Sequence, residues 1–104
     1  MLTFEPENKS DTNTFRGPMK PVGFQQIVGL VAATNLTPPA NAKYAVFTVE
    51  TQSVRYRDDG TAPTTVVGML LAAGAQQIEY TGDLSAIQFI QTAATATLDI
   101  SYYG

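Results

Sequence analysis

The residues of this 104-residue chain that could do chemistry are carboxylates, hydroxyls and a few amines, because it contains neither histidine nor cysteine. Histidine is the commonest general base and metal ligand, and cysteine is the usual thiol nucleophile, so both routes are closed. Catalysis would need paired carboxylates, a metal held by oxygen ligands, or a Ser/Thr–Lys arrangement. The spacing of the nine acidic residues therefore decides whether an active site can form.

Asp58 and Asp59 are the only adjacent carboxylates in the chain. Neighbouring strand residues point to opposite faces, so the two would form an acid–base pair only if a turn bent them together. The run also lacks the alternating oxygen ligands and the distal glutamate of an EF-hand loop. Because Gly60 follows, we interpret Asp58 and Asp59 as a turn, with a cation or partner contact as the alternative. The sequence predicts a protein that is not an enzyme and has no metal or cofactor site.

Two arginines precede this turn on a predicted strand at 53–57, where apolar residues alternate with Arg55 and Arg57. One interpretation is an exposed pair that compensates Asp58 and Asp59, which would add little stability. The other is that the two guanidinium groups contact a partner subunit, a role for which arginine is well suited. These four residues are therefore candidate partner contacts.

Five tyrosines suggest a sugar-binding hypothesis, because aromatic rings stack on sugar rings. Three of them, Tyr56, Tyr80 and Tyr102, fall on predicted inward faces, where core packing with the hydroxyl at the rim is the simpler interpretation. The chain also contains no tryptophan, which weakens the hypothesis. Sugar binding stays an alternative.

The formal net charge of −3 argues against nucleic acid as a partner, since such binding normally needs a basic patch. The six basic residues are spread along the chain, and only Arg55 and Arg57 lie close in sequence. The longest apolar stretch, 66–75, is too short to cross a bilayer. The first residues lack the basic start and apolar run of a signal peptide, so we expect synthesis in the cytoplasm without membrane insertion.

The chain reads as six to eight short strands with turn signals every eight to twelve residues. The predicted strands lie at 43–51, 53–57, 66–72, 76–80, 85–91 and 95–103, with an apolar run at 27–33. In the last strand, the alternation predicts that Ala96, Leu98, Ile100 and Tyr102 face inward. A helix at 66–75 is the competing interpretation, and Gly68 and Gly74 count against it. The fold class predicted is all-β, a single antiparallel β-sandwich or jelly-roll-like domain.

The first 23 residues differ from the rest in holding three of the six prolines and no sustained periodicity. We therefore predict an extended N-terminal arm at 1–23, with a partly disordered terminus as the alternative, and a β-sandwich domain at 24–104. Phe4 and Phe15 are isolated apolar anchors in the arm and are candidate partner contacts. Deleting 1–20 is expected to leave thermal unfolding nearly unchanged while weakening attachment to neighbouring subunits.

Four runs carry a resemblance to a known class of proteins: SVRYRDDGTAPT at 53–64, GMLLAAG at 68–74, IEYTGDLSAIQFI at 78–90 and ATLDISYY at 96–103. Together they resemble a pattern found in small proteins encoded among the structural genes of tailed bacteriophages. The resemblance covers roughly residues 40–104 and supplies no catalytic or ligand residue. It implies a component of the virion, made in the cytoplasm of the bacterial host.

The resemblance and the composition together favour a capsid decoration (cement) protein or another head or tail accessory subunit. The alternative is a carbohydrate- or receptor-binding module of a tail fibre or tip. Hydrophobic residues make up 44% of the chain and charged residues only 14%, and such surfaces usually meet protein. We therefore expect a homo-oligomer, with a trimer favoured, and contact with the major capsid protein or another virion protein.

Overall fold

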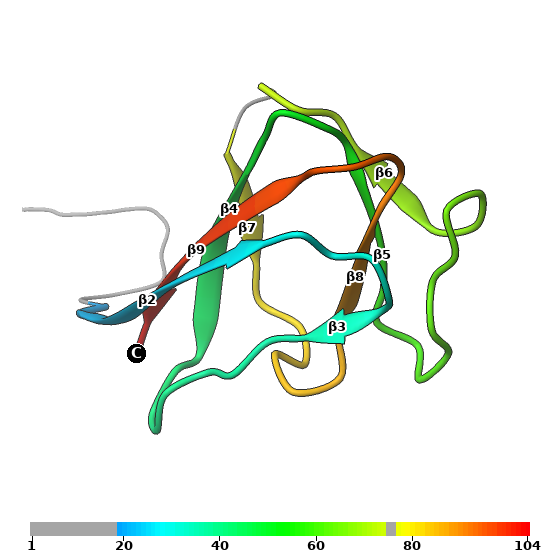
Figure 1. Ribbon diagram of the computed structural model, residues 1–104. Coiled ribbons are helices and arrows are strands. Elements are labelled where there is room, and N and C mark those ends of the chain that lie inside the picture. The colour runs from blue at the N-terminus through cyan, green and yellow to red at the C-terminus, as the bar shows by residue number, and fades with distance from the viewer. Residues whose placement is uncertain (1–18, 75–76) are drawn as a thin grey trace, which may run out of the picture.

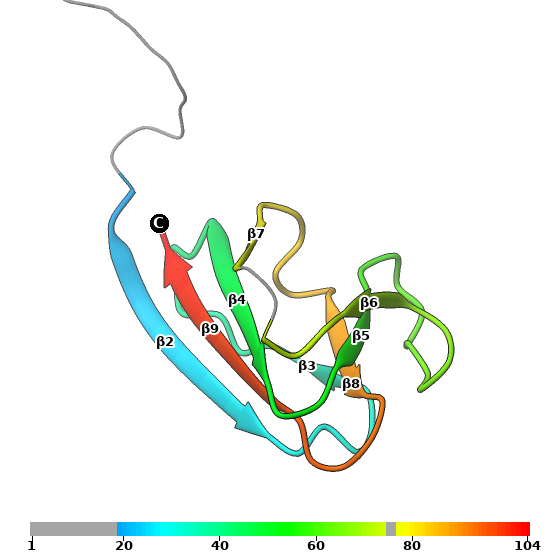
Figure 2. The same ribbon diagram turned by 90° about the horizontal axis from the view of Figure 1, so that it is seen from above.

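The computed structural model describes residues 19–74 and 77–104, and these ranges contain eight β-strands and no helix. The strands form two antiparallel sheets, in the orders β2–β9–β4–β7 and β3–β8–β5–β6 (Figure 1). The two sheets pack face to face with the core between them (Figure 2), which confirms the predicted all-β sandwich. No helix in the described ranges is long and apolar enough to cross a membrane. The strand bounds are β2 Pro21–Val28, β3 Thr34–Asn35, β4 Tyr44–Glu50, β5 Val54–Arg57, β6 Met69–Leu71, β7 Ile78–Tyr80, β8 Gln88–Gln91 and β9 Thr97–Tyr103.

Strand β9 lies between β2 and β4, and we call these three long strands the central ladder. Its pairing with β4 runs without interruption from Tyr44 opposite Tyr103 to Glu50 opposite Thr97. Alternate side chains of β9 are fully buried, as the sequence alternation predicted. Their partners on the inner face of β4 are buried as well, so the ladder supplies one whole wall of the core. These inward residues are Leu98, Ile100 and Tyr102 on β9 and Ala45, Phe47 and Val49 on β4.

Aromatic rings pack together in the core, one pair across the two sheets and one pair within each sheet. Phe47 of β4 meets Phe89 of β8 edge to face, with ring centroids 5.1 Å apart. Tyr80 of β7 stacks on Phe47 at 5.8 Å, and Tyr56 of β5 tilts against Phe89 at 5.9 Å. Such aromatic contacts add about 0.5–1.5 kcal/mol beyond the burial of their area. They place Tyr56 and Tyr80 on inner faces, as predicted.

Every connection between consecutive described strands passes from one sheet to the other, except the one between β5 and β6. The sharpest crossing joins β4 to β5 at Thr51, whose φ of 76° falls in the left-handed region. There the Gln52 N–H donates to the Glu50 carbonyl at 2.9 Å, which closes a γ-turn. The exception is the β5–β6 hairpin, which stays within one sheet. Its long loop at 58–68 does not have to cross between the sheets.

Several predicted boundaries differ from the structure. Lys20 exchanges two backbone hydrogen bonds with Gly104, at 3.0 and 2.9 Å, and β2 begins at Pro21, so the paired chain starts before the predicted boundary at residue 24. The apolar run at 27–33 is divided, because Gly29 turns the chain with a φ of 80° and β3 follows. The predicted strands at 66–72 and 85–91 shorten to β6 and β8. Phe4 and Phe15 lie outside the described residues.

Candidate functional site

The β5–β6 loop, residues 58–68, begins with Asp58 and Asp59, and Arg55 and Arg57 lie on the strand that precedes it. It leaves the sandwich at the end of β5 and returns along β6, an edge strand (Figure 1). Thr64 and Val67 exchange backbone hydrogen bonds at 2.9 and 3.3 Å, which fold its far end into a turn. Pro63 is buried beneath this turn. The loop therefore has a defined shape of its own.

Arg55 holds the returning leg of the loop against β5. Its Nε donates to the Thr65 carbonyl at 3.2 Å, and its Nη1 donates to the Gly68 carbonyl at 2.9 Å. Gly68 has a φ of 141°, and a Cβ there would lie 3.1 Å from both the Arg55 Cβ and the Tyr56 carbonyl oxygen. Only glycine fits this close approach without strain. Arg55 thus bonds to backbone carbonyls of its own loop and not to Asp58 or Asp59, and its contact with a partner stays a prediction.

Arg57 pairs with the acidic turn, as the first of the two interpretations expected. Its Nε and Nη2 donate to the two carboxylate oxygens of Asp59, at 3.1 and 2.5 Å, in a bidentate ion pair. The hydrogen bonds from Arg57 are the main reason why the pKa of Asp59 lies below its usual range. The same pair raises the pKa of Arg57. Both groups are open to solvent, so the pair orients the turn more than it stabilises the fold.

Asp58 connects the loop to the opposite sheet. The Tyr80 hydroxyl on β7 donates to Asp58 Oδ2 at 2.8 Å. Burial, followed by this hydrogen bond, raises the pKa of Tyr80. A side chain at Gly82 would collide with the Tyr80 ring and hydroxyl, so a glycine is needed for Tyr80 to lie where it does. The sequence predicted an inward-facing Tyr80 but neither its hydrogen bond with Asp58 nor the role of Gly82, because nothing in their spacing relates them to Asp58.

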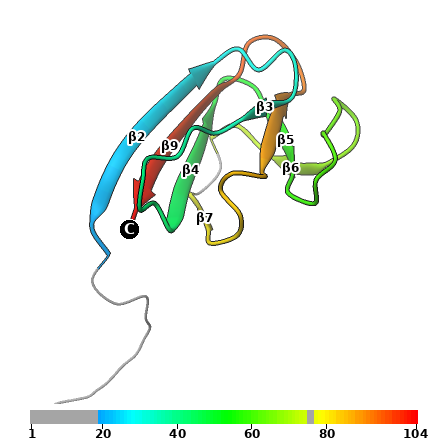
Figure 3. The ribbon, with the colours of Figure 1, turned by 90° about the horizontal axis from the view of Figure 1, so that it is seen from below.

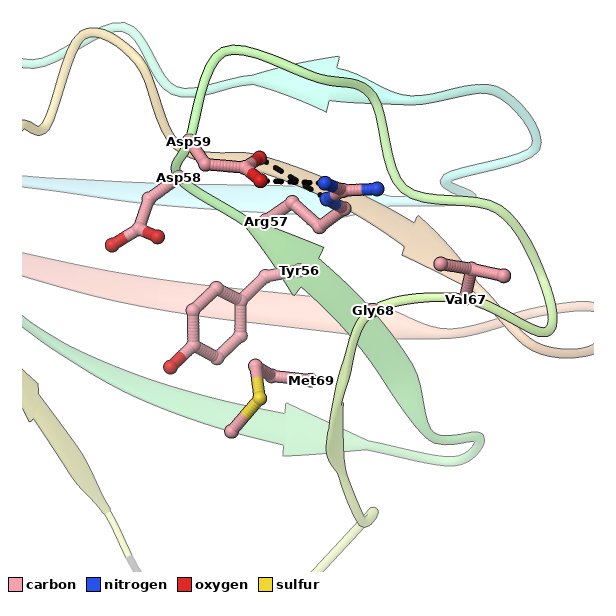
Figure 4. A pocket seen from close by; sticks show the side chains of 7 residues that line it. All are labelled: Tyr56, Arg57, Asp58, Asp59, Val67, Gly68 and Met69. Carbon is pink, nitrogen blue, oxygen red and sulfur yellow. Dashed lines mark hydrogen bonds and ion pairs between the residues drawn. The ribbon is translucent and has the colours of Figure 1, made fainter.

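A pocket of about 250 Å³ lies where the two legs of the loop meet the strands. Figure 4 shows the Tyr56 ring and the Met69 side chain next to each other, with Asp58 beyond them and the Arg57–Asp59 pair on the other side of the strand. Both carboxylates already have donors, from Tyr80 and Arg57. Among the described residues, no three metal-ligating side chains gather into a possible metal site. The residues that line the pocket are Tyr56, Arg57, Asp58, Asp59, Val67, Gly68 and Met69.

Exposed large apolar side chains of the described residues fall in two stretches of the chain, one along β2 and one along β6, which we call the β2 patch and the β6 patch. The β2 patch comprises Phe24 and Val28 on β2 and Val31 just after it. The β6 patch comprises Val66 and Val67 at the end of the loop and Met69 and Leu70 on β6. The two edge strands lie at opposite ends of the molecule in Figures 2 and 3. The sequence reasoning used Phe24 only as a boundary, although a strand places Phe24, Gln26 and Val28 on one face.

The outer face of the central ladder is polar between its ends. Gln26 Nε2 donates to Asp99 Oδ1 at 2.8 Å, and the Thr48 hydroxyl donates to Asp99 Oδ2 at 3.5 Å. A hydrogen bond with Asp99, and repulsion between the two carboxylates, raise the pKa of Glu50. This row of polar groups separates the β2 patch from the rest of the sheet.

No known protein family, curated protein or solved structure matches the chain.

Proposed function

We propose that the chain is a non-enzymatic structural protein of a tailed-phage virion, a capsid decoration (cement) subunit or another head or tail accessory. In this role it stabilises the particle through protein–protein contacts. One support is the resemblance of the runs at 53–64, 68–74, 78–90 and 96–103 to small proteins encoded among phage structural genes. The other support comes from the surface.

The observation that carries the proposal is the gathering of exposed apolar side chains into the β2 and β6 patches. Single exposed apolar residues are ordinary, but seven of them along two edge strands and the chain next to them favour surfaces that meet protein. Both patches lie on edge strands, which also offer unpaired backbone groups to a neighbour. Two patches at opposite ends suit a subunit that contacts a copy of itself on one side and the particle on the other.

The partners proposed are further copies of the chain, with a trimer favoured from the sequence, and the major capsid protein or another virion protein. The proposed location is the virion, after synthesis in the bacterial host cytoplasm. Neither nucleic acid nor membrane is a proposed partner.

Quantitative mass spectrometry of purified phage particles, and of heads separated from tails, tests this proposal. Hundreds of copies per particle would identify a decoration protein, and six or twelve would identify a connector or tail component. Absence of the chain from purified particles would overturn the proposal.

Matched variants test whether the β6 patch makes the contact with the particle. Val67→Asp together with Leu70→Asp places charge within the patch, and we expect it to reduce incorporation at least tenfold. Thr61→Asp adds charge to an exposed position of the same loop outside the patch and serves as the control. Equal incorporation of all three proteins would place the contact elsewhere on the chain.

The pocket favours a second candidate function, binding of a sugar by a tail fibre or tip module. The Tyr56 ring and Met69 offer an apolar wall, and Asp58 and Asp59 offer carboxylate oxygens for sugar hydroxyls. A glycan array and titration with host polysaccharide test this function, with the Met69 methyl resonance as a local probe. Binding that shifts this resonance would favour the second function, and its absence at millimolar sugar would exclude the pocket as a sugar site.

A further inference from the structure

The four edge strands of the two described sheets differ greatly in length. Strand β3 has two residues, and β6 and β7 have three each, whereas β2 has eight. Proteins commonly protect sheet edges by keeping them short, by placing charges or prolines on them, or by bulges. Strand β2 has Pro21 and a bulge near its start, but Gly23 to Val28 contains none of these protective features. Its edge is therefore the one most open to pairing.

The hydrogen bonds of β2 with β9 show which backbone groups of β2 do not bond to β9. The Gly29 N–H donates to the Ala96 carbonyl at 2.9 Å, continuing the register in which Ile27 faces Leu98. Antiparallel pairs alternate, so the odd-numbered residues of this stretch bond to β9. The N–H and C=O groups of Phe24, Gln26 and Val28 point away from the sheet. Within the described residues β2 pairs with β9 alone.

We propose that β2 pairs antiparallel with β2 of a second copy of this chain, about a two-fold axis that passes through Gln26. In this register, the three residues of one copy whose backbone groups point away from the sheet all face the same three residues of the other copy. Gln26 then faces its own counterpart, and Phe24 faces Val28 on both sides of the axis. The two sheets merge into one of eight strands, with their outer faces on the same side.

The side chains at this edge are complementary to themselves. Phe24 and Val28 are 68% and 64% exposed, and both lie on the outer face with Gln26 between them. The proposed register places each Phe24 ring beside a valine, and aromatic–β-branched pairs across strands are stabilising. The strand carries no charge from Pro21 to Val28, so bringing two copies together opposes no like charges. Self-pairing therefore covers the apolar part of β2 without an electrostatic cost.

The inference rests on the proposal that the chain self-associates, and its two-fold interface closes a dimer through β2, in place of the trimer favoured from the sequence. Contact along one strand edge is smaller than the roughly 800 Å² per partner of a standard stable interface. We therefore expect a dissociation constant in the micromolar range or weaker for the free protein. On a particle, neighbouring attachment sites would raise the effective concentration of the copies.

Cysteine cross-linking tests the register directly, because the natural chain contains no cysteine. In the proposed register the two residues at position 26 face each other about 5.5 Å apart between Cα atoms, within the range that a disulfide spans. Gln26→Cys should therefore form a disulfide-linked dimer on mild oxidation at high micromolar concentration. Phe24→Cys and Val28→Cys should each link slowly alone, because the same residue of the second copy lies four positions along the strand. Mixing these two variants should produce the linked heterodimer.

Thr61→Cys, exposed on the β5–β6 loop, reports the rate of random collision. We expect Gln26→Cys to link at least tenfold faster, and a further Phe24→Asp substitution to bring its rate down to that of Thr61→Cys. Urea unfolding of each variant checks that the fold is intact. Equal linking rates for Gln26→Cys and Thr61→Cys would overturn the β2 pairing. This holds also if the protein forms a trimer through another surface. The virion test of the proposed function would be unaffected by that result.

Discussion

The central ladder and the β5–β6 loop are stabilised in different ways. In the ladder, three strands of seven or eight residues pair along nearly their full length, and one face of each contributes to the core. The loop lies between strands of four and three residues, and its shape depends on a few particular bonds. These are the two donations from Arg55 to backbone carbonyls, the Arg57–Asp59 pair and the Tyr80–Asp58 hydrogen bond.

This difference separates stability from recognition. The buried surface of the central ladder is spread over many residues. Substitutions at its solvent-facing positions should therefore leave the register of strand pairing unchanged. The loop presents apolar and charged groups together beside a pocket, and it can vary without altering the core. We therefore expect substitutions in the ladder to change the free energy of unfolding most, and those in the loop to change local geometry and contacts.

The largest effect is expected at Ile100, which is fully buried in the middle of β9. Ile100→Ala should lower the free energy of unfolding by about 2–5 kcal/mol, because it removes buried methyl groups and leaves a cavity. Ser101→Ala on the outer face of the same strand is the control and should change it by about 0.5 kcal/mol or less. Chemical denaturation measures both. Similar losses for the two variants would show that burial in β9 does not dominate stability.

The ladder is also the part of the fold that the sequence predicts best. Alternation in 95–103 identified the buried face of β9, because a pleated strand with one buried face leaves that period in its sequence. Asp58, Asp59 and Gly60 were correctly interpreted as a turn, and Gly60 has a φ of 89°. The two short strands β3 and β6 left too little periodicity for their bounds to be predicted.

The candidate site was less predictable, because its bonds join residues by three-dimensional position. Arg55 and Arg57 look equivalent in the sequence, yet one bonds to carbonyls ten and thirteen residues away and the other to a carboxylate two residues away. Tyr80 reaches Asp58 across 22 residues and from the other sheet. No local pattern encodes such pairings. The exposed face of β2 was predictable in principle, from the alternation of Phe24, Gln26 and Val28.

In the loop, the largest effect is expected at Gly68. Gly68→Ala combines a backbone conformation reserved for glycine with crowding against Arg55, Tyr56 and Pro63, so we expect a loss of about 2–3 kcal/mol. Gly60→Ala also lies at positive φ but has no atom within 4 Å of the added carbon, and should lose only about 1 kcal/mol. Thermal and chemical unfolding compare the two. A smaller loss for Gly68→Ala would show that the loop relaxes at little cost.

Substitution of Arg55 should cost more folding stability than substitution of Arg57. Arg55→Ala leaves two loop carbonyls without their donor and should cost about 1–2 kcal/mol, within the range for hydrogen bonds to charged groups. Arg57→Ala breaks only a solvent-exposed pair and should leave the unfolding midpoint unchanged within error. Limited proteolysis should show faster cleavage in 61–67 for Arg55→Ala alone. Equal unfolding midpoints and equal cleavage rates for the two variants would refute the role that we assign to Arg55, which is to hold the returning leg of the loop against β5.

A smaller effect, visible only in alkali, is expected at Tyr102 in the ladder. Burial raises its pKa to about 12, and its hydroxyl donates to Gln25 Oε1 at 2.5 Å. The folded state therefore holds the proton more tightly than the unfolded chain, whose tyrosines titrate near 10. The stability that follows from this is complete below about pH 10 and is lost as the pH rises toward the folded value. Tyr102→Phe should flatten the loss of stability between about pH 10 and pH 12, and Tyr103→Phe on the outer face serves as the comparison.

The smallest effect concerns Asp59, and it is a change in pKa rather than in stability. Hydrogen bonds from Arg57 hold the pKa of Asp59 below its ordinary value, so the pair persists at neutral pH and is lost as the pH falls through the folded value. Carboxyl chemical shifts measured by NMR should show Asp59 titrating below the range of an unperturbed aspartate, near 3.9. In Arg57→Ala its pKa should move upward, whereas in Arg55→Ala it should stay, because Arg55 bonds to carbonyls on the other leg of the loop. An Asp59 pKa that is unchanged in Arg57→Ala would mean that the turn backbone, through the Thr61 N–H, holds the carboxylate without help from the arginine.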